Sequence, residues 1–193
     1  MKLRYKIVNG ILLVLVVAVG ALAMTISYTS DCSAPPNVDE SSRTMKAVVR
    51  RCYGGPEVLE YTDVAIPVAG PKAVVVQVKA AAANPLDYHF MRGSPYLMRL
   101  SSGIGRPDDP RMGADFAGIA EGDRVFGGRN GAFAEFIVIP EDRAIAHLPD
   151  DVSFEAAAAI PIAAVTALQA LRDDGKLKAG EKVLINGASG GVG

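Results

Sequence analysis

The run LINGASGGVG, residues 184–193, decides how the rest of the chain is interpreted, because it has the form of a nucleotide-binding turn. Ala188, Gly190 and Gly193 match A-x-G-x-x-G, the dinucleotide fingerprint with alanine in place of its first glycine. In that motif the middle glycine lets the backbone approach a pyrophosphate, and the last lets a helix pack closely on a strand. Residues 182–185, KVLI, predict the buried strand that must precede the turn. A glycine-rich turn without a ligand is the alternative interpretation.

The pattern of the preceding residues changes near residue 150. Between residues 45 and 140, short β-branched runs alternate with glycine-rich turns, which is typical of a small β-barrel. This pattern predicts strands over residues 45–51, 72–83 and 132–139. Residues 150–177 are rich in alanine and leucine at helical spacing, and the candidate helix starts are Ser153 with Glu155, and Glu141-Asp142. The order is therefore barrel, helix, and the first strand of an α/β unit.

Composition excludes some classes of function. The 193 residues carry a formal net charge of -1 and no basic stripe, so nothing favours nucleic-acid binding. The two cysteines, Cys32 and Cys52, are too few for a four-thiolate zinc site or a disulfide framework. A single disulfide between them can form if the chain lies in an oxidising compartment, but the presence of two cysteines alone does not favour that bond.

Residues 1–26 predict a membrane anchor or a signal segment. Lys2, Arg4 and Lys6 precede an apolar run, and residues 7–26 are long enough to cross a bilayer, which takes about 20 residues. A single-pass N-terminal anchor is the favoured interpretation, and export after cleavage of a signal near Ala23 is the alternative. Residues 27–44 are rich in serine, proline and acidic side chains with little to bury, so they predict a flexible tether.

Several runs after residue 44 resemble the medium-chain dehydrogenase/reductase superfamily, in its zinc-independent quinone-oxidoreductase-like branch. In family order they are MKAVV with YGGPEVLE, NPLDYHFMRG, GADFAG, GDRVFGGRNGAFAEF, IPIAAVTALQAL and VLINGASGGVG. The resemblance implies an α/β fold: a GroES-like β-barrel over residues 45–160, then the truncated start of a Rossmann NAD(P)-binding domain over residues 161–193. It also implies hydride transfer from NAD(P)H to a quinone, an enone or a related carbonyl compound. The resemblance favours NADPH over NADH as the cofactor. It also allows a homodimer of the full-length form.

The resemblance also assigns site residues. Asn84 and Asp87 match the polar catalytic positions near the nicotinamide and the substrate, and Thr166 matches a cofactor contact at the domain junction. Weaker candidates for the substrate pocket are Tyr88, His89 and Tyr96. The glycine turn supplies the other cofactor-binding residues, which are Ala188, Gly190, Gly191, Val192 and Gly193. The ordinary alternatives are a turn at Asn84, a helix cap for Asp87, and for Thr166 a hydroxyl bonded to its own helical turn.

Metal is absent from the implied mechanism. The zinc-using branch carries a Gly-His-Glu run where this chain has Gly113-Ala114-Asp115, and His89 and His147 have no cysteine partners at ligand spacing. The resemblance therefore implies reduction without zinc, with the pocket supplying orientation and a path for the proton.

Two departures from the family pattern bear on whether the chain forms a complete fold and a complete enzyme. Only Ile119-Ala120-Glu121 separates Gly118 from Gly122, where the family has a longer strand-and-turn stretch, so the neighbouring strands are expected to lose ladder partners. The chain also stops at the cofactor site, so we expect a fragment that is not a competent reductase by itself. The alternative function is a non-catalytic, membrane-attached GroES-like remnant or partner-binding module.

The expected topology conflicts with the expected chemistry. Positive charges before the apolar run favour a cytoplasmic N-terminus, which puts the barrel outside the membrane. Reduced nicotinamide cofactors are intracellular, so the side of the membrane on which the barrel lies stays open.

Overall fold

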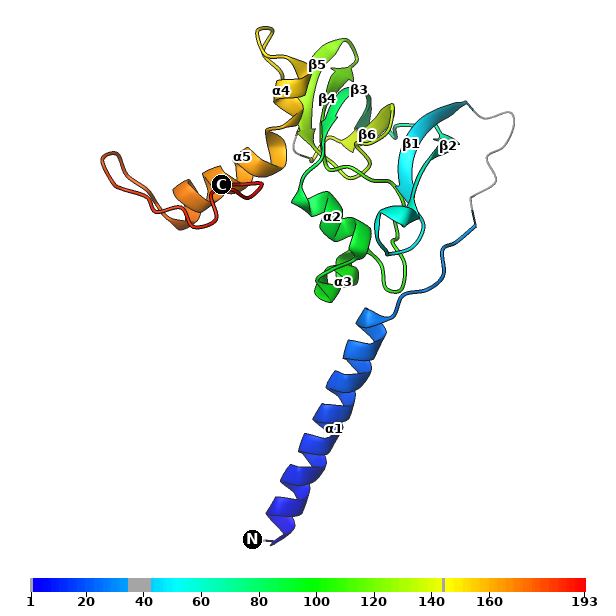
Figure 1. Ribbon diagram of the computed structural model, residues 1–193, viewed down its shortest axis with the longest axis vertical. Helices are drawn as coiled ribbons and strands as arrows, with labels where there is room; N and C mark the ends of the chain where they lie inside the picture. The colour runs from blue at the N-terminus through cyan, green and yellow to red at the C-terminus, as the bar shows by residue number, and fades with distance from the viewer. Residues whose placement is uncertain (1, 35–42, 144) are drawn as a thin grey trace. The chain divides into compact units, whose positions relative to one another are not determined.

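The chain divides into two compact units in the computed structural model, which describes residues 2–34, 43–143 and 145–193 (Figure 1). The smaller unit comprises Met1–Pro35, Arg51–Val58 and His89–Pro110. The larger unit comprises Pro36–Arg50, Leu59–Tyr88 and Arg111–Gly193. The larger unit contains both sheets and the glycine turn, and the smaller unit contains the N-terminal helix.

Two antiparallel sheets form the centre of the larger unit. One has the order β1-β2 and the other the order β6-β3-β4-β5-β7. Their strands are β1 (Thr44–Arg50), β2 (Leu59–Ala65), β3 (Ala73–Ala82), β4 (Asp115–Ala120), β5 (Asp123–Gly128), β6 (Phe136–Pro140) and β7 (Ile145–His147). The three strands predicted from the sequence are confirmed as β1, β3 and β6. The last begins only at Phe136, because residues 133–135 bond to β1: Val48 N–H donates to the oxygen of Phe133 (2.8 Å).

A tight hairpin joins β4 and β5 where the family has a longer connection. The ladder runs to Ala120 opposite Asp123, so Glu121 and Gly122 form a two-residue turn. Both turn residues have positive φ, 50° and 99°, as in the type I′ turns that match the twist of a hairpin. The expected loss of ladder partners is therefore wrong, since β4 pairs with β3 on one side and β5 on the other.

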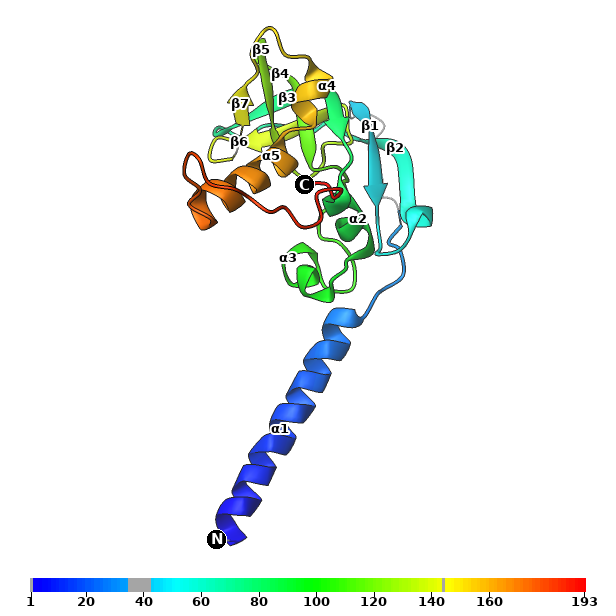
Figure 2. The same cartoon turned by 60° about the vertical axis from the view of Figure 1, so that its left-hand side comes forward.

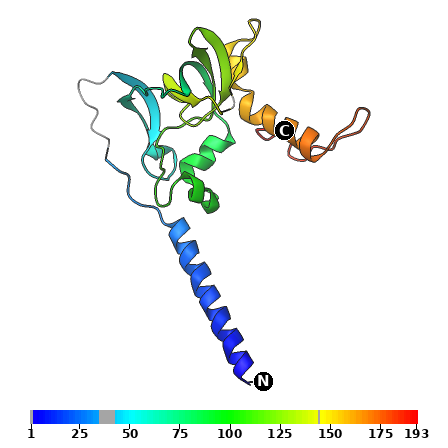
Figure 3. The same cartoon turned by 180° about the vertical axis from the view of Figure 1, so that it is seen from behind.

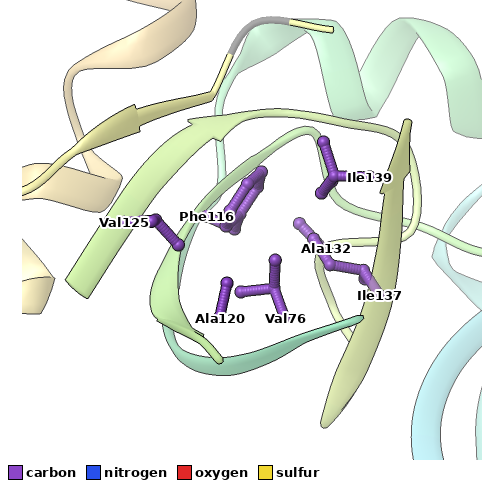
Figure 4. Close-up of a cluster of buried hydrophobic side chains, with 7 residues drawn as sticks. All are labelled: Val76, Phe116, Ala120, Val125, Ala132, Ile137 and Ile139. Carbon is purple, nitrogen blue, oxygen red and sulfur yellow. The ribbon is translucent and has the colours of Figure 1, made fainter. Parts of the chain in front are cut away.

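Apolar side chains cover both faces of the five-stranded sheet. Alternation along β4 sends Phe116 and Ala117 to opposite faces. One cluster, drawn in Figure 4, contains Val76, Phe116, Ala120, Val125, Ala132, Ile137 and Ile139. The buried residues of the other are Ala117, Leu148, Ala157 and Ala158. The second cluster holds α4 (Phe154–Ala158) on the sheet, next to the start of the helix that follows.

The helices after the sheet confirm one predicted start and correct another. Ser153 caps α4, accepting a hydrogen bond from the N–H of Ala156 (3.1 Å). α5 (Pro161–Leu168) and a π-helical turn, η3 (Gln169–Asp174), follow. A helix start at Glu141-Asp142 is wrong: the N–H of Arg143 donates to the oxygen of Pro140 in a turn.

The strand predicted over residues 182–185 is also absent from the described structure. These residues are exposed and have no extended ladder partner. A lone strand leaves its N–H and C=O groups without partners, so a β-branched run does not hold the extended form by itself. The pattern of residue types was right for a strand, but a strand also needs a neighbouring one.

A long helix, α1 (Lys2–Ser27), leads into the smaller unit. Its segment Ile7–Ser27 has 21 residues and mean hydropathy 2.7, and no part of that apolar stretch is buried against the protein. By length and composition this one helix could cross a membrane, and a signal sequence passes the same test. The unit's other helical segments are η1 (Pro56–Val58), η2 (Tyr96–Met98) and α3 (Arg99–Ser102), together with the second half of α2 (Pro85–Arg92).

A disulfide joins Cys32 to Cys52 in the smaller unit, against the sequence-based expectation. The two residues lie twenty apart in the chain, and composition says nothing of their proximity. Residues close to Cys32 also bond to the unit: the N–H of Ser30 donates to the oxygen of Gly105 (2.9 Å). Of the segment predicted as a flexible tether, residues 28–32 thus make fixed contacts, and residues 35–42 lie outside the described part.

Candidate functional site

Asn84 and Asp87 form a reciprocal cap at the start of α2. The Asn84 side-chain oxygen accepts a hydrogen bond from the N–H of Leu86 (2.8 Å). In return, Asp87 Oδ2 accepts one from the N–H of Asn84 (2.9 Å). This arrangement is a capping box, in which two otherwise unpaired N–H groups are satisfied. The cap uses one oxygen of each side chain and leaves the Asn84 amide nitrogen facing away from the helix.

Asp115, the first residue of β4, meets that amide nitrogen. Asn84 Nδ2 donates to Asp115 Oδ2 (3.1 Å), and the N–H of Ile162 donates to Asp115 Oδ1 (3.1 Å). Ile162 lies in the first turn of α5, where the helix dipole favours a negative charge. One buried carboxyl therefore connects the sheet, the start of α2 and the start of α5.

Burial controls the charge of this cluster. Burial raises the pKa of the Asp115 carboxyl to about 6, the negative charge of Asp87 adds to the rise, and the bonds from Ile162 and Asn84 oppose it. Burial also raises the pKa of Asp87, against the bond from the Asn84 N–H. Asp115 is 2% exposed and Asp87 7%. Two neighbouring carboxyls with raised pKa values are a recognised feature of functional sites, because they can hold or release a proton near neutral pH.

Sequence analysis missed Asp115 as a site residue. In the run GADFAG this aspartate stands where the zinc-using branch has a glutamate. A signal was nevertheless present, because Asp115 is the one charged residue between Gly113 and Ala120 in a run that is almost wholly buried. A charge in such a run requires a partner.

The glycine turn lies against the start of α2. A Cβ built on Gly191 would lie 2.7 Å from Cδ of Pro85, so the backbone of the turn approaches Pro85 as closely as a glycine permits. Gly187 has a positive φ of 77°, and the N–H of Gly190 donates to its oxygen (2.9 Å). In Figure 2 the red C-terminal segment returns toward α2. The turn and the Asn84 cluster are thus neighbours within the larger unit.

The other predicted site residues have local surroundings of their own. Thr166 Oγ1 donates to the oxygen of Ile162 (2.6 Å), which is the ordinary bond of a helix hydroxyl to its own turn. Tyr88 is about half exposed and ends the larger unit's part of α2. His89 and Tyr96 belong to the smaller unit, where His89 Nδ1 bonds to the oxygen of Ser94 (2.8 Å) and the Tyr96 ring lies over the Arg99 guanidinium.

Metal ligands do not gather in the part of the chain that the structure describes. Among those residues, no three His, Cys, Asp or Glu side chains form a group that could hold a metal ion.

Known proteins match most of the chain in sequence and in structure. No family model matches it. The quinone oxidoreductase of Pseudomonas aeruginosa is 36% identical over 153 residues, which are 77% of this chain and 47% of the relative. The solved quinone oxidoreductase of Pseudomonas syringae pv. Tomato has 36% identity and a TM-score of 0.64, covering 77% of this chain and 47% of its own. The chain is a homologue of the N-terminal part of the medium-chain quinone oxidoreductases.

The homology confirms the α/β fold class at the level of that N-terminal, GroES-like region. The chain spans about half the length of the curated relatives it matches. A mycobacterial protein solved in complex with NADPH has 28% identity and a TM-score of 0.60, covering 72% of this chain and 44% of its own. Relatives of the chain therefore bind NADPH.

The glycine turn is packed closely on its own chain. Glycine is required at Gly191 and Gly193, because a Cβ there would collide with Pro85 and with Ala188 respectively. Because glycine has no side chain, the main-chain N–H groups of a glycine-rich turn can approach a pyrophosphate. The strand that precedes this turn in the dinucleotide fingerprint is not formed among the described residues.

Proposed function

We propose that the chain carries the substrate side of an NADPH-dependent oxidoreductase that reduces a quinone, an enone or a related carbonyl compound without zinc. Residues 45–160 would form the GroES-like substrate domain, and residues 161–193 the start of the nucleotide-binding domain. The observation that carries the proposal is that the glycine turn lies against Pro85, which directly follows Asn84 of the Asn84–Asp87–Asp115 cluster. Homology to quinone oxidoreductases supports the substrate class.

The residues of the cluster have distinct roles in this proposal. The backbone of residues 190–193 would hold the phosphates of the cofactor, which supplies a hydride when bound. Asn84 Nδ2 donates one N–H to Asp115, and its second N–H would orient a substrate oxygen or a cofactor hydroxyl. Asp87 and Asp115, buried and hydrogen-bonded around Asn84, would fix that amide and store the proton that accompanies reduction.

A substitution at Asn84 tests these roles. Asn84→Asp keeps the oxygen that caps α2 but replaces the amide that donates to Asp115 with a second acceptor, so circular dichroism must first show that the variant is folded. We expect the rate of NADPH oxidation by 1,4-benzoquinone, measured on protein isolated from its native source, to fall by about 100-fold or more. Gly70→Ala, at an open loop position, is the control and should keep the rate. Unchanged activity in Asn84→Asp would contradict the proposal.

A second candidate is a non-catalytic, membrane-attached module that binds a partner. The apolar helix α1, which the proposed reduction does not use, is the observation behind it. The two candidates separate in one titration of the wild-type protein. Saturable binding of NADPH, followed by fluorescence of the reduced nicotinamide, supports the reductase, and its absence in the natively isolated protein supports the module.

Attachment to a membrane through residues 7–26 is part of either proposal. α1 supports it by its length and its fully exposed apolar surface. A cleaved signal segment has the same composition, so N-terminal sequencing of membrane-extracted protein distinguishes them: an uncut Lys2-Leu3-Arg4 terminus, with or without Met1, supports the anchor. Homodimerisation, and the side of the membrane on which the larger unit lies, stay proposals to be measured.

A further inference from the structure

Large apolar side chains are exposed on the smaller unit beside the C-terminal end of α1 (Figure 3). The set, named here the loop patch, comprises Tyr28, Tyr96, Leu97, Leu100 and Ile104, each 50% to 68% exposed. η2 runs directly into α3, so Tyr96 and Leu97 share a face with Leu100, since residues three and four apart on a helical stretch are neighbours. Clustered apolar surface of this kind marks an interaction site.

Arg99 fastens the loop patch to the end of α1. Its side chain is buried, and Nη1 donates to the main-chain oxygens of Ser27 (3.2 Å) and Tyr28 (2.7 Å). A cation at this position satisfies the unpaired carbonyls of the last helical turn and complements the helix dipole. The rings of Tyr53 and Tyr96 flank the guanidinium, at 4.4 and 4.8 Å from its central carbon.

Two further links hold the same junction. The ring of Tyr28 packs on Gly105, where a Cβ would lie 3.3 Å from the ring. The Cys32–Cys52 disulfide ties the segment after α1 to the smaller unit. The loop patch is therefore held at a fixed level relative to the last turn of α1.

Charged side chains border the loop patch but are sparse within its run: Arg92 and Arg106 flank it, and Asp31 follows Tyr28. From Gly93 to Gly105 the sequence has one charged residue, Arg99, and its guanidinium is turned inward to the carbonyls. Protein surfaces that face water usually have charged residues of both signs interspersed. A surface that enters the lipid headgroup region presents apolar and aromatic groups instead.

We propose that the loop patch lies in the interfacial layer of the lipid bilayer that α1 crosses. The inference rests on the membrane-spanning role proposed above for α1. Its 21-residue apolar segment is about 31 Å long, close to the ~30 Å hydrocarbon core. Ser27 then lies at the membrane surface, which puts Tyr28 and Tyr96 at the depth where tyrosine is enriched.

The absence of tryptophan from the chain permits a direct test. Single-tryptophan variants of the full chain, Leu97→Trp and Leu100→Trp, are reconstituted into phosphatidylcholine–phosphatidylglycerol vesicles with or without brominated acyl chains. Leu13→Trp, in the middle of α1, reports whether the helix is inserted. Val68→Trp, at a loop position that is 91% exposed, is the solvent-exposed reference.

We expect both patch variants to lose emission in brominated vesicles and to emit at shorter wavelength than Val68→Trp. Quenching of Leu13→Trp without quenching of either patch variant overturns the inference and leaves the anchor intact. A blue shift without quenching also overturns it, because a second copy or another protein then covers the patch. No quenching of Leu13→Trp removes the anchor itself.

Discussion

Asp115 is the residue on which the candidate site depends, because it bonds to two elements that are far apart in the chain. It accepts hydrogen bonds from Asn84, before α2, and from Ile162, in α5. A carboxyl that is 2% exposed is costly to ionise, and this cost is why its pKa is raised to about 6. The site therefore couples its own geometry to pH.

Stability should fall as pH rises through this window. Below about pH 4 the carboxyl is protonated in both the folded and the unfolded chain, so burial carries no penalty. As pH rises to about 6 the unfolded chain has already released the proton, and the folded chain still holds it, so the free energy of unfolding should drop by about 2–3 kcal/mol. The raised pKa of Asp87 acts in the same direction.

Urea titrations of wild type and Asp115→Asn at pH 4, 5, 6 and 7 measure this drop. Asp115→Asn removes the ionisation and should flatten the profile between about pH 4 and about pH 6. Asp151→Asn, at an exposed carboxyl, is the matched control and should keep the wild-type slope. An equally steep profile in Asp115→Asn would show that another group is responsible.

The β4–β5 hairpin is the element that preserves the sheet despite its short connection. Its turn needs positive φ at Glu121 and at Gly122, a conformation that costs a residue with a Cβ about 1–2 kcal/mol. Glutamate at the first of these positions already carries such a cost, whereas asparagine and glycine are the favoured pair.

Three substitutions separate conformational strain from packing. A Cβ on Gly122 or on Gly70 would meet no atom within 4 Å, but only Gly122 has a positive φ. Gly122→Ala should therefore lower the free energy of unfolding by about 1–2 kcal/mol, and Gly70→Ala should leave it unchanged or raise it by up to about 1 kcal/mol. Glu121→Asn should raise it by several tenths of a kcal/mol. Equal effects of the two alanine substitutions in thermal melts would rule out the turn assignment.

What could be predicted from the sequence was whatever depends on neighbours in the chain. Strands β1 and β3 followed from β-branched runs, and the α4 cap from Ser153. The failures depend on distant partners. The run at residues 182–185 needs a neighbouring strand, Asp115 needs Asn84 and Ile162 beside it, and the disulfide needs two cysteines close in space. No local sequence pattern predicts which distant residues make these contacts.

For the whole molecule, two independent features indicate the same side of the membrane. Positive charges at Lys2, Arg4 and Lys6 favour a cytoplasmic N-terminus for the proposed anchor, which would put everything after α1 on the opposite side. The disulfide between Cys32 and Cys52 fits that side, since oxidising compartments preserve such bonds and the cytosol reduces them. NADPH is produced in the cytosol, so the proposed reductase chemistry requires the opposite orientation or another source of reductant.

The thiol state in intact cells decides between these orientations. Cells are quenched in acid, and the denatured protein is treated with polymer-linked maleimide, with or without prior reduction. If the chain after α1 is exported, no polymer should add without reductant, and two adducts should appear with it, one for each cysteine. Cys32→Ser, which leaves Cys52 unpaired, should take one adduct without reductant and shows that the reagent works. Two adducts on the unreduced wild-type protein would place these residues in the cytosol, within reach of NADPH, and would strengthen the reductase over the non-catalytic module.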